Sequence, residues 1–529
     1  MSTGNTQDRQ GSDTRTAAHS PTGRRQFIGT ALAAAVTTAT LPVSRLWAAA
    51  GNSDGVSGEV TAVTLSGQSI TLSPSDIKDF RASLRGHLLL ASDAGYDQAR
   101  RLWNGAFDRH PALIARCAGA ADVVQAVNFA RSHKLLTAVH SGGHSISGQS
   151  SCDGGLMIDL SPMKGIRIDP AAKTASAQAG VLLGEFDRES QAFGLATTLG
   201  TAADTGIAGL TLGGGQGRLA RKFGLSCDNL IGADLVTADG KLLHVSEHEN
   251  ADLFWGIRGG GGNFGVATSF EYRLHPLGPK VLAGNRVYPI AQARGILQAL
   301  REFCAKAPDE MSISASLSNA APGVPAGRYL AYEVVYCGDL GEGERLLAPL
   351  QKLGKPLFDN VTAKMYIEAQ LGLSGASPAP LPPGLNVYVK SGFLRTLPDT
   401  LIDASLKHFA TAPAWLGELG IGQLGGAMAR VQPTATAYWN RLAQYDLILQ
   451  GFWADRAQDQ QNLQQGRATW EVFEPFTENY YVNTEPAADE KRLRATYGDN
   501  YPKLVQLKNK YDPMNLFRLN ANIKPSVTG

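Results

Sequence analysis

The run Val139-His140-Ser141-Gly142-Gly143-His144-Ser145-Ile146-Ser147-Gly148 is the most informative part of this chain, because it places histidines in a glycine-rich turn. Gly142, Gly143 and Gly148 permit positive φ and bring bare backbone N–H groups close to a ligand, as an anion cradle requires. The apolar residues just before the run are typical of a short strand. We therefore expect a strand that leads directly into a ligand-binding loop.

Two further glycine clusters follow, at Gly206–Gly217 and at Arg258–Val266. A single glycine-rich run is usually a tight turn or a flexible loop. Three such runs, each next to an apolar segment, favour three loops that meet at one phosphorylated or planar ligand. A Rossmann dinucleotide site at Gly213–Gly217 is excluded by its context, because no acidic residue follows a second strand at the expected distance.

These residues resemble the berberine bridge enzyme-like oxidases, a group within the vanillyl-alcohol oxidase superfamily that carries a PCMH-type FAD-binding domain. The similarity runs from about Gly95 to the carboxyl end. It rests on the motifs Arg131 to Gly148, Gly154 to Ser161, Gly213 to Gly217, Cys227 to Leu230, Thr237 to Gly240, Asp252 to Gly265, Tyr481 to Asn483, Tyr497-Gly498 and Lys510 to Arg518. The resemblance implies bound FAD and an FAD-linked oxidase activity.

The order of segments predicts an α+β fold in two subdomains. Short apolar segments and the helix-like stretch Ala121–Lys134 suit a cofactor domain. The helix-like stretch Ile290–Ala307 then precedes segments of period two, which predict an antiparallel sheet with helices on one face. Those segments are Met311–Leu317, Tyr329–Tyr336 and Tyr445–Trp453.

We divide the chain into five parts. They are a signal segment (1–50), an extension with the start of the FAD domain (51–108), a PCMH-type FAD-binding domain (109–280), a substrate-binding domain (281–475) and a C-terminal segment that completes the FAD site (476–529).

Composition favours a small-molecule ligand. The chain has 529 residues, 43% of them hydrophobic, which suffices for a large core. With 49 basic and 47 acidic residues, its formal charge of +2 gives no electrostatic case for nucleic acid or an anionic membrane. We expect a small-molecule substrate and O₂ as the partners.

The amino-terminal segment resembles a twin-arginine export signal. Arg24-Arg25 precede a weakly apolar stretch, and Ala48-Ala49-Ala50 suit a cleavage site near Ala50. A membrane anchor is the alternative, but the stretch Phe27–Leu41 is shorter than the roughly 20 residues that a spanning helix needs. We expect export of the folded protein by the twin-arginine translocation machinery to the periplasm or beyond the cell.

The cysteines indicate neither a metal site nor a disulfide framework. There are five, an odd count, with no close C-x-x-C pair. We expect most of them to be small buried hydrophobic residues. One pair can still oxidise after export.

The resemblance assigns covalent attachment of the flavin to His144. His140 lies where many relatives have arginine, so it remains a rival for attachment or a contact to phosphate or substrate. Many relatives form a second bond through a cysteine, and Ala202 stands at that position here. The resemblance therefore implies a single histidyl linkage, with a lower flavin potential and a less open site than in doubly linked relatives.

The same resemblance supplies a set of FAD contacts. From the first loop they are Ser141, Gly142, Gly143, Ser145 and Gly148; from the second region Gly200, Thr201, Asp204, Thr205, Gly206, Gly209, Gly213, Gly214 and Gly215; and from later segments Gly265, Val266, Asn483, Asn520 and Asn522. Gly200 corresponds to a position where a small residue keeps space for O₂, which favours an oxidase over a dehydrogenase. Backbone geometry is the simpler explanation for a glycine there.

Tyr481 matches the tyrosine that several alcohol- and sugar-oxidising relatives place over the flavin, and we expect it to act as the catalytic base. Its phenol must have a depressed pKa or a partner to serve near neutral pH; a packing role is the alternative. Gln450 is the second catalytic candidate. Relatives with an acidic base carry it on the strand that matches Tyr445–Trp453, where we identify Ile448 and Gln450 on one face and no carboxylate. This disfavours amine cyclisation and favours oxidation of a hydroxyl group.

The predicted activity is thus an exported FAD-dependent oxidase that takes a hydride from a hydroxyl-bearing carbon and produces H₂O₂. The alternatives are a flavin-dependent tailoring enzyme for oxidative cyclisation or oxygenation, and a flavin-retaining binding protein without activity. Aromatic residues of the substrate half suit a sugar ring or an aromatic alcohol, or are ordinary core. They are Tyr329, Tyr332, Tyr336, Tyr366, Tyr388, Trp439, Phe452 and Trp453.

Overall fold

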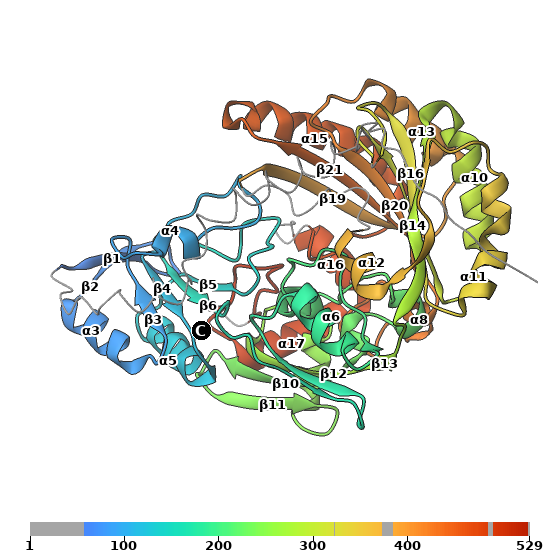
Figure 1. Cartoon of the computed structure of the whole chain (residues 1–529). Coiled ribbons are helices and arrows are strands. Elements are labelled where there is room, and N and C mark those ends of the chain that lie inside the picture. Colours follow the sequence, from blue (N-terminus) through green and yellow to red (C-terminus); the bar gives the residue numbers. More distant parts are fainter. Residues whose placement is uncertain (1–57, 322, 373–383, 485–489, 527–529) are drawn as a thin grey trace, which may run out of the picture. The chain divides into compact units, whose positions relative to one another are not determined.

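A small parallel sheet carries the first glycine loop. In the computed structural model, which describes residues 58–321, 323–372, 384–484 and 490–526, β4 (Leu113–Arg116), β6 (Leu156–Asp159) and β5 (Thr137–His140) pair in parallel. Strand β3 (His87–Leu89) adds antiparallel to β4, and helix α5 (Ala120–Ser132) connects β4 to β5 (Figure 1). The predicted signal segment, 1–50, lies outside the described residues. Because β5 ends at His140, the loop begins at the carboxyl end of a parallel strand, as expected.

The other two glycine clusters border a five-stranded antiparallel sheet of order β11-β10-β12-β8-β7. Its strands are β7 (Ile166–Asp169), β8 (Thr174–Gln178), β10 (Leu230–Thr237), β11 (Leu242–Ser246) and β12 (Gly265–Arg273). The second cluster lies in the connection between β8 and β10, and the third leads into β12. Helices in these connections are α6 (Leu183–Gln191), α7 (Ile207–Leu212), α8 (Ala220–Phe223) and α9 (Ala251–Ile257).

The substrate half is one large antiparallel sheet of order β17-β14-β16-β15-β20-β21-β19, with β18 paired to β14. The strands are β14 (Lys280–Pro289), β15 (Met311–Ser318), β16 (Tyr329–Tyr336), β17 (Phe358–Asp359), β18 (Thr362–Met365), β19 (Asn386–Leu394), β20 (Glu418–Gln423) and β21 (Tyr445–Trp453). Helices α10 (Ala293–Cys304), α11 (Leu340–Leu347), α13 (Asp399–Thr411) and α15 (Asp459–Phe473) cover one face of it (Figure 1). The predicted α+β class, with an antiparallel sheet covered by helices, is confirmed.

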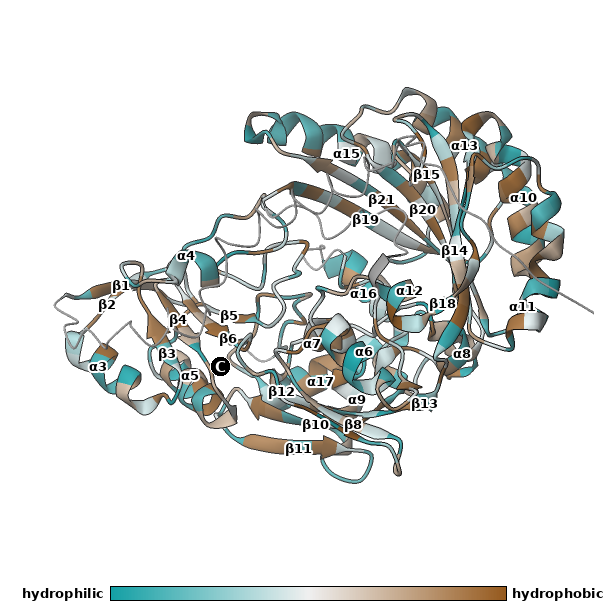
Figure 2. Cartoon of the chain, in the orientation of Figure 1, coloured by the Kyte–Doolittle hydropathy of each residue, from teal (hydrophilic) through white to brown (hydrophobic). Residues whose placement is uncertain are grey.

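Amphipathic patterns explain why the helices take this face. Helix α10 buries Ala293, Ile296, Leu297 and Leu300 against the sheet, and its other side is hydrophilic (Figure 2). Strand β21 alternates strictly between buried and partly buried residues. Its odd-numbered residues join the core under the helices, so its even-numbered residues face the opposite side of the sheet.

The C-terminal segment returns to the first half of the chain. Helix α17 (Tyr501–Tyr511), which follows α16 (Glu490–Tyr497), packs against α9. Within it Lys508 and Asp512 form a fully buried ion pair with Nζ and Oδ2 2.7 Å apart. Lys508 Nζ also donates to the carbonyls of Asn263 and Phe517. This pair therefore joins the C-terminal segment to the third glycine loop.

Shorter elements complete the described fold. They are β1 (Val60–Val63), β2 (Ser69–Leu72), β9 (Leu195–Ala196), β13 (His275–Pro276), α3 (Pro74–Ser83), α4 (Tyr96–Ala99), α12 (Tyr366–Gly372) and α14 (Ala427–Arg430). All five cysteines are present as free thiols, four of them buried. Over the ranges that the structure describes, no helix is both long and apolar enough to cross a bilayer.

Candidate active site

A cavity of about 940 Å³ lies where the glycine loops face the uncovered side of the large sheet. The first loop lines it through Ser141, Gly142, Gly143, His144 and Ser145. The second region lines it from Gly200 to Gly206 and again at Gly209. The third cluster and the C-terminal segment contribute Gly261, Gly262, Gly265, Val266 and Asn520, and the sheet contributes strands β15, β16, β20 and β21. Three loops and one face of the large sheet thus line a single cavity.

The structure separates the two candidate histidines. His144 lines the cavity, stacks on Trp103 with ring centroids 4.3 Å apart, and lies with Nε2 3.7 Å from Asp204 Oδ1. Its buried Nε2 has no hydrogen-bond partner, and burial lowers the pKa of its ring against the opposing effect of Asp204. His140 is buried behind the loop, where its Cε1 lies 2.8 Å from the position of a Cβ on Gly143.

The loop glycines bring backbone against backbone and leave room in the cavity. A Cβ on Gly142 would lie 2.4 Å from the amide nitrogen of Gly206, so these two loops touch. A Cβ on Gly209 or Gly262 would meet nothing within 4 Å, so both residues face open space. Asn520 donates to the Gly262 carbonyl at 3.1 Å while its buried Oδ1 lacks a partner. Open glycine walls and unsatisfied polar atoms fit a large, partly polar cofactor.

Five predicted FAD contacts do not line the cavity: Gly148, Gly213, Gly214, Gly215 and Asn522. The four glycines have a packing role instead. A Cβ would lie 2.3 Å from the Phe107 ring at Gly148, 2.1 Å from the Asn483 amide at Gly213, 2.5 Å from the Tyr438 ring at Gly214 and 2.2 Å from Ser226 Oγ at Gly215. At each of these glycines a neighbouring side chain packs directly against the backbone, and the glycines shape the site in this way.

Gly200 lines the cavity but does not open onto free space. A Cβ there would lie 2.9 Å from Leu183 Cδ1 and 3.2 Å from Leu210 Cδ1. Packing against the two leucines therefore explains this glycine, and the expectation that it holds space for O₂ has no support in the geometry.

Tyr481 has a well-defined polar environment. Its hydroxyl oxygen accepts hydrogen bonds from the Gly215 amide at 3.1 Å and from Asn483 Nδ2 at 2.9 Å. Burial outweighs these donors and raises the pKa of the phenol to about 12. The expected role as base calls for a depressed pKa or a partner, and burial moves the pKa in the opposite direction.

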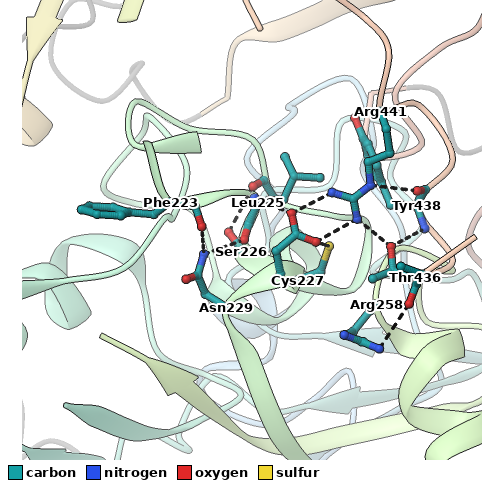
Figure 3. A network of polar contacts seen from close by, with 12 residues as sticks. Phe223, Leu225, Ser226, Cys227, Asn229, Arg258, Thr436, Tyr438 and Arg441 are labelled. Atoms are coloured by element: carbon teal, nitrogen blue, oxygen red, sulfur yellow. Dashed lines mark hydrogen bonds and ion pairs between the residues drawn. The ribbon is translucent and has the colours of Figure 1, made fainter. Parts of the chain in front are cut away.

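A buried ion pair holds the segment from Thr436 to Arg441 (Figure 3). Arg441 donates to both carboxylate oxygens of Asp228, at 2.7 and 2.8 Å, and to Thr436 Oγ1 at 2.6 Å. The segment that these bonds fix presents Tyr438, whose hydroxyl accepts from Gln216 Nε2 at 3.1 Å and whose ring packs over Gly214. The second glycine cluster is thereby locked to a segment more than two hundred residues away.

The sequence interpretation missed a carboxylate on β21. Asp446 shares the cavity-facing side of this strand with Ile448 and Gln450, so the statement that no carboxylate lies there is wrong. Its Oδ1 lies 2.1 Å from the position of a Cβ on Gly422, and burial raises its pKa to about 6. The period of two in this strand was the signal, because residues 446, 448 and 450 necessarily share a face.

A second carboxylate, Glu418 on β20, faces the same cavity. It is only 7% exposed, and Gln450 Nε2 lies 3.5 Å from its Oε2. Burial, with a smaller effect from Glu333, raises the pKa of Glu418 to about 7. Strand β20 carries two glycines, so only Leu419 and Ile421 mark its apolar face and the sequence signal for this residue is weak.

A third carboxylate is paired. Glu333 Oε1 accepts from Arg218 NH2 at 2.9 Å, and Arg218 NH1 donates to Gln370 Oε1 at 3.0 Å. Gln370 in turn donates to the buried Asp187 at 3.1 Å, whose pKa burial raises to about 7. This chain of contacts joins α6, α12 and β16 at one end of the cavity.

None of the predicted substrate-contacting aromatics lines the cavity within the described ranges. Tyr332, Tyr336, Tyr388 and Trp453 belong to the core under the helices, and Tyr366 to a second core cluster. The alternative that these residues are ordinary core is correct for those five. The substrate wall instead combines hydroxyl, amide, carboxyl and small side chains with the aliphatic Ile313, Val389 and Ile448.

Comparison with known proteins agrees with this site. Residues 111–246 match the family model for an FAD binding domain, and residues 480–524 match the model described as berberine and berberine like. An FAD-linked oxidoreductase of Dictyostelium discoideum is 32% identical over 459 residues, covering 85% of this chain and 97% of the relative. The (R)-6-hydroxynicotine oxidase of Paenarthrobacter nicotinovorans is 32% identical over 464 residues, covering 84% and 97%.

The comparison with solved structures agrees with these sequence matches. The 6-hydroxy-D-nicotine oxidase of Arthrobacter nicotinovorans superimposes with a TM-score of 0.77 at 28% identity, covering 84% of this chain and 99% of the other. A chitooligosaccharide oxidase superimposes with a TM-score of 0.76 at 27% identity, covering 85% and 100%. Fold and site thus define an FAD-dependent redox enzyme. The chain belongs to the berberine bridge enzyme-like FAD-linked oxidoreductases of the PCMH-type superfamily.

Proposed function

We propose that this FAD-linked oxidoreductase takes a hydride from a carbon that bears a hydroxyl group and passes the electrons to O₂, which yields H₂O₂. The supporting observation is one cavity with glycine loops on one side and acid-bearing strands on the other. Bound FAD supplies the hydride acceptor. The names of the chitooligosaccharide and (R)-6-hydroxynicotine oxidases among its relatives support an oxidase.

Glu418 is the side chain best suited to remove the proton. Its pKa of about 7 lies close to neutral pH, where a general base is most effective, and Gln450 holds its carboxylate. The C–H bond of the donor breaks with its electron pair, the O–H proton moves to Glu418 and a C=O bond forms. O₂ then takes up two electrons and two protons.

Tyr481 receives a different role from the expected one. With a pKa of about 12 the phenol keeps its proton near neutral pH. Its oxygen already accepts two N–H groups, so its own O–H is free to donate to the donor's hydroxyl oxygen. Tyr481 thus orients the hydroxyl group that Glu418 deprotonates.

The proposed cofactor arrangement keeps a single covalent bond from His144 to the flavin. Both histidines have a buried ring nitrogen without a partner, but only His144 lies in the cavity, whereas His140 lies behind the loop. Ala202 lines the same cavity, so the position of a second linkage carries no sulfur. Export by the twin-arginine route, to the periplasm or the medium, completes the proposal and rests on Arg24-Arg25, the weakly apolar stretch after them and the cleavage-type residues Ala48-Ala49-Ala50.

Oxidative cyclisation or oxygenation of a natural product remains a second candidate because of one observation. The argument against an amine-cyclising enzyme was the lack of a carboxylate on β21, and Asp446 removes that argument. Such an enzyme would release a cyclised or oxygenated product rather than a simple carbonyl compound.

The test uses the purified flavin-loaded protein. Hydroxylated donors, among them sugars and amino alcohols, are mixed with it without air, and flavin bleaching is followed by absorbance. Air is then admitted and H₂O₂ is assayed. We expect bleaching and a stoichiometric yield of H₂O₂, and Glu418→Gln should lower kcat by roughly 10²–10⁴-fold while the flavin stays bound. Bleaching without H₂O₂ contradicts the oxidase, and a cyclised or oxygen-bearing product supports the second candidate.

A further inference from the structure

The cavity-facing side of the large sheet has an ordered arrangement of side chains. In the strand register, Glu333 lies opposite Ser314, Ser314 opposite Gly422, and Gly422 opposite Asp446. The next row places Ser316 opposite Gly420 and Gly420 opposite Ile448. Only small side chains and Ile448 therefore lie between the carboxylates, and they form a floor on which a compact molecule can rest.

Glu418 and Asp446 both lean over this floor. Glu418 Oε1 lies 3.5 Å from the position of a Cβ on Gly420, and Asp446 Oδ1 lies 2.1 Å from the corresponding position on Gly422. Those two glycines are two residues apart on one strand, so the positions are separated by about 7 Å. One compact molecule can reach both carboxylates.

Asp446 has no cationic partner among the residues that the structure describes, since none of the ion pairs there includes it. Arg218, one of the two arginines on the cavity wall, is bound to Glu333. Glu333 lies three strands from Asp446, which corresponds to roughly 14 Å. Arg188, the other arginine on the cavity wall, belongs to α6 in the cofactor half and is exposed.

A partly buried carboxylate without a counter-ion carries a desolvation cost, because desolvation disfavours its charge. A molecule with a cationic nitrogen placed over Gly422 and Ser314 would supply the missing charge beside Asp446. Its carbon skeleton would contact Ile448 and Gly420. Its hydroxyl end would then lie beside Glu418, about 7 Å along the strand.

We propose that the substrate is a cationic hydroxyl compound, an amino alcohol or amino sugar, whose nitrogen binds to Asp446 while its hydroxyl group faces Glu418. The inference rests on the proposed oxidase function for the reaction at the hydroxyl end. It assigns Asp446 to recognition of the donor and not to proton removal.

The test compares two molecules of nearly equal shape. Choline carries a permanent positive charge and a hydroxyl group, and 3,3-dimethylbutan-1-ol is its neutral counterpart. Binding of each to the flavin-loaded full-length protein is measured by calorimetry without air, for wild type, Asp446→Asn, Asp446→Glu and Glu302→Gln. Glu302 is an exposed carboxylate on α10 and provides the matched control for loss of one negative charge.

We expect choline to bind at least about tenfold more tightly than its neutral counterpart, equivalent to about 1.4 kcal/mol. Asp446→Asn should reduce the ratio to near unity, Asp446→Glu should retain part of it and Glu302→Gln all of it. Equal binding of the two molecules to wild type, or a ratio that survives Asp446→Asn, overturns the inference.

Remaining outcomes separate this inference from the oxidase proposal. If neither molecule binds while neutral donors bleach the flavin, the cationic class is wrong and the oxidase stands. If choline is preferred through Asp446 but no hydroxylated donor bleaches the flavin, the recognition site stands and the oxidase is wrong. If neither molecule binds and no donor bleaches the flavin, both are wrong.

Discussion

At the scale of single residues, two histidines four positions apart have different surroundings. Only His144 reaches the cavity, where it stacks on Trp103 and leaves a buried nitrogen unsatisfied. His140 fills the space behind Gly143. From the sequence, both His140 and His144 remained candidates for flavin attachment. The sequence does not give the direction of each side chain, and that direction decides which of the two reaches the flavin.

The linkage follows from this difference. We expect acid precipitation of the wild type to leave yellow flavin with the pellet, His144→Ala to release it, and His140→Ala to retain it. Absorbance of the pellet and the supernatant is the measurement. Flavin released from the wild type, or retained by His144→Ala, would rule out a bond through this residue.

Buried Glu418 makes stability depend on pH in a defined direction. Its pKa rises from 4.5 to about 7 on folding, so between these values the folded protein binds more protons than the unfolded chain. Stability from this group is therefore lost as pH rises through that window. We expect Glu418→Gln to gain about 3 kcal/mol relative to wild type between pH 4.5 and pH 8.

Thermal unfolding of both proteins across that pH range measures the effect. The difference in Tm between Glu418→Gln and wild type should widen between pH 4.5 and 7 and stay constant at higher pH. Glu302→Gln, an exposed carboxylate, should show no such change. A gap that is the same at every pH would mean that Glu418 is ionised throughout.

At the scale of elements, α17 carries two lysines in contrasting settings. Lys508 pairs with Asp512 in full burial, whereas Lys510 pairs with Asp252 at the surface. Removing one partner of a buried pair leaves an uncompensated charge and costs about 3–5 kcal/mol. An exposed pair contributes about 0–1 kcal/mol.

We expect Lys508→Met to lose several times more stability than Lys510→Met, and to hold the cofactor less firmly, because Lys508 also bonds the carbonyls of Asn263 and Phe517. Chemical unfolding followed by flavin fluorescence compares the two variants. Similar losses of stability in the two variants would show that the buried ion pair does not hold the C-terminal segment in place.

Strands were easier to predict than the direction in which they face. The segments Met311–Leu317, Tyr329–Tyr336 and Tyr445–Trp453 all form strands, because their period of two is strong. Asp446 was missed although its parity matched that of Gln450. Glu418 was harder to find, since its strand carries two glycines and only Leu419 and Ile421 form an apolar face.

At the scale of the whole molecule, the two halves are joined by buried charges far apart in the sequence. Arg218 bonds Glu333, and Arg441 bonds Asp228 across 213 residues. Sequence patterns predicted both halves. The ion pairs that join the halves could not be predicted, because no local periodicity of the sequence indicates which distant residues pair. The same limit explains why Gly213, Gly214 and Gly215 were assigned to the cofactor when they pack against side chains.

Export is also a property of the whole chain. We expect Arg24→Lys combined with Arg25→Lys to leave the flavin-loaded protein in the cytoplasm of a host with twin-arginine translocation, since the pair is the recognised signal. Cell fractionation with flavin absorbance measures this, and Arg15→Lys is the control. Undiminished export of the double variant would point to another route.

The position of the C-terminal segment affects when the cavity is completed during synthesis. Phe517, Leu519, Asn520 and Ala521 line the cavity beside the first and third glycine loops, although they are made hundreds of residues later. The ribosome therefore releases the loops long before the wall that closes over them exists. We therefore expect firm retention of the cofactor only after the end of translation.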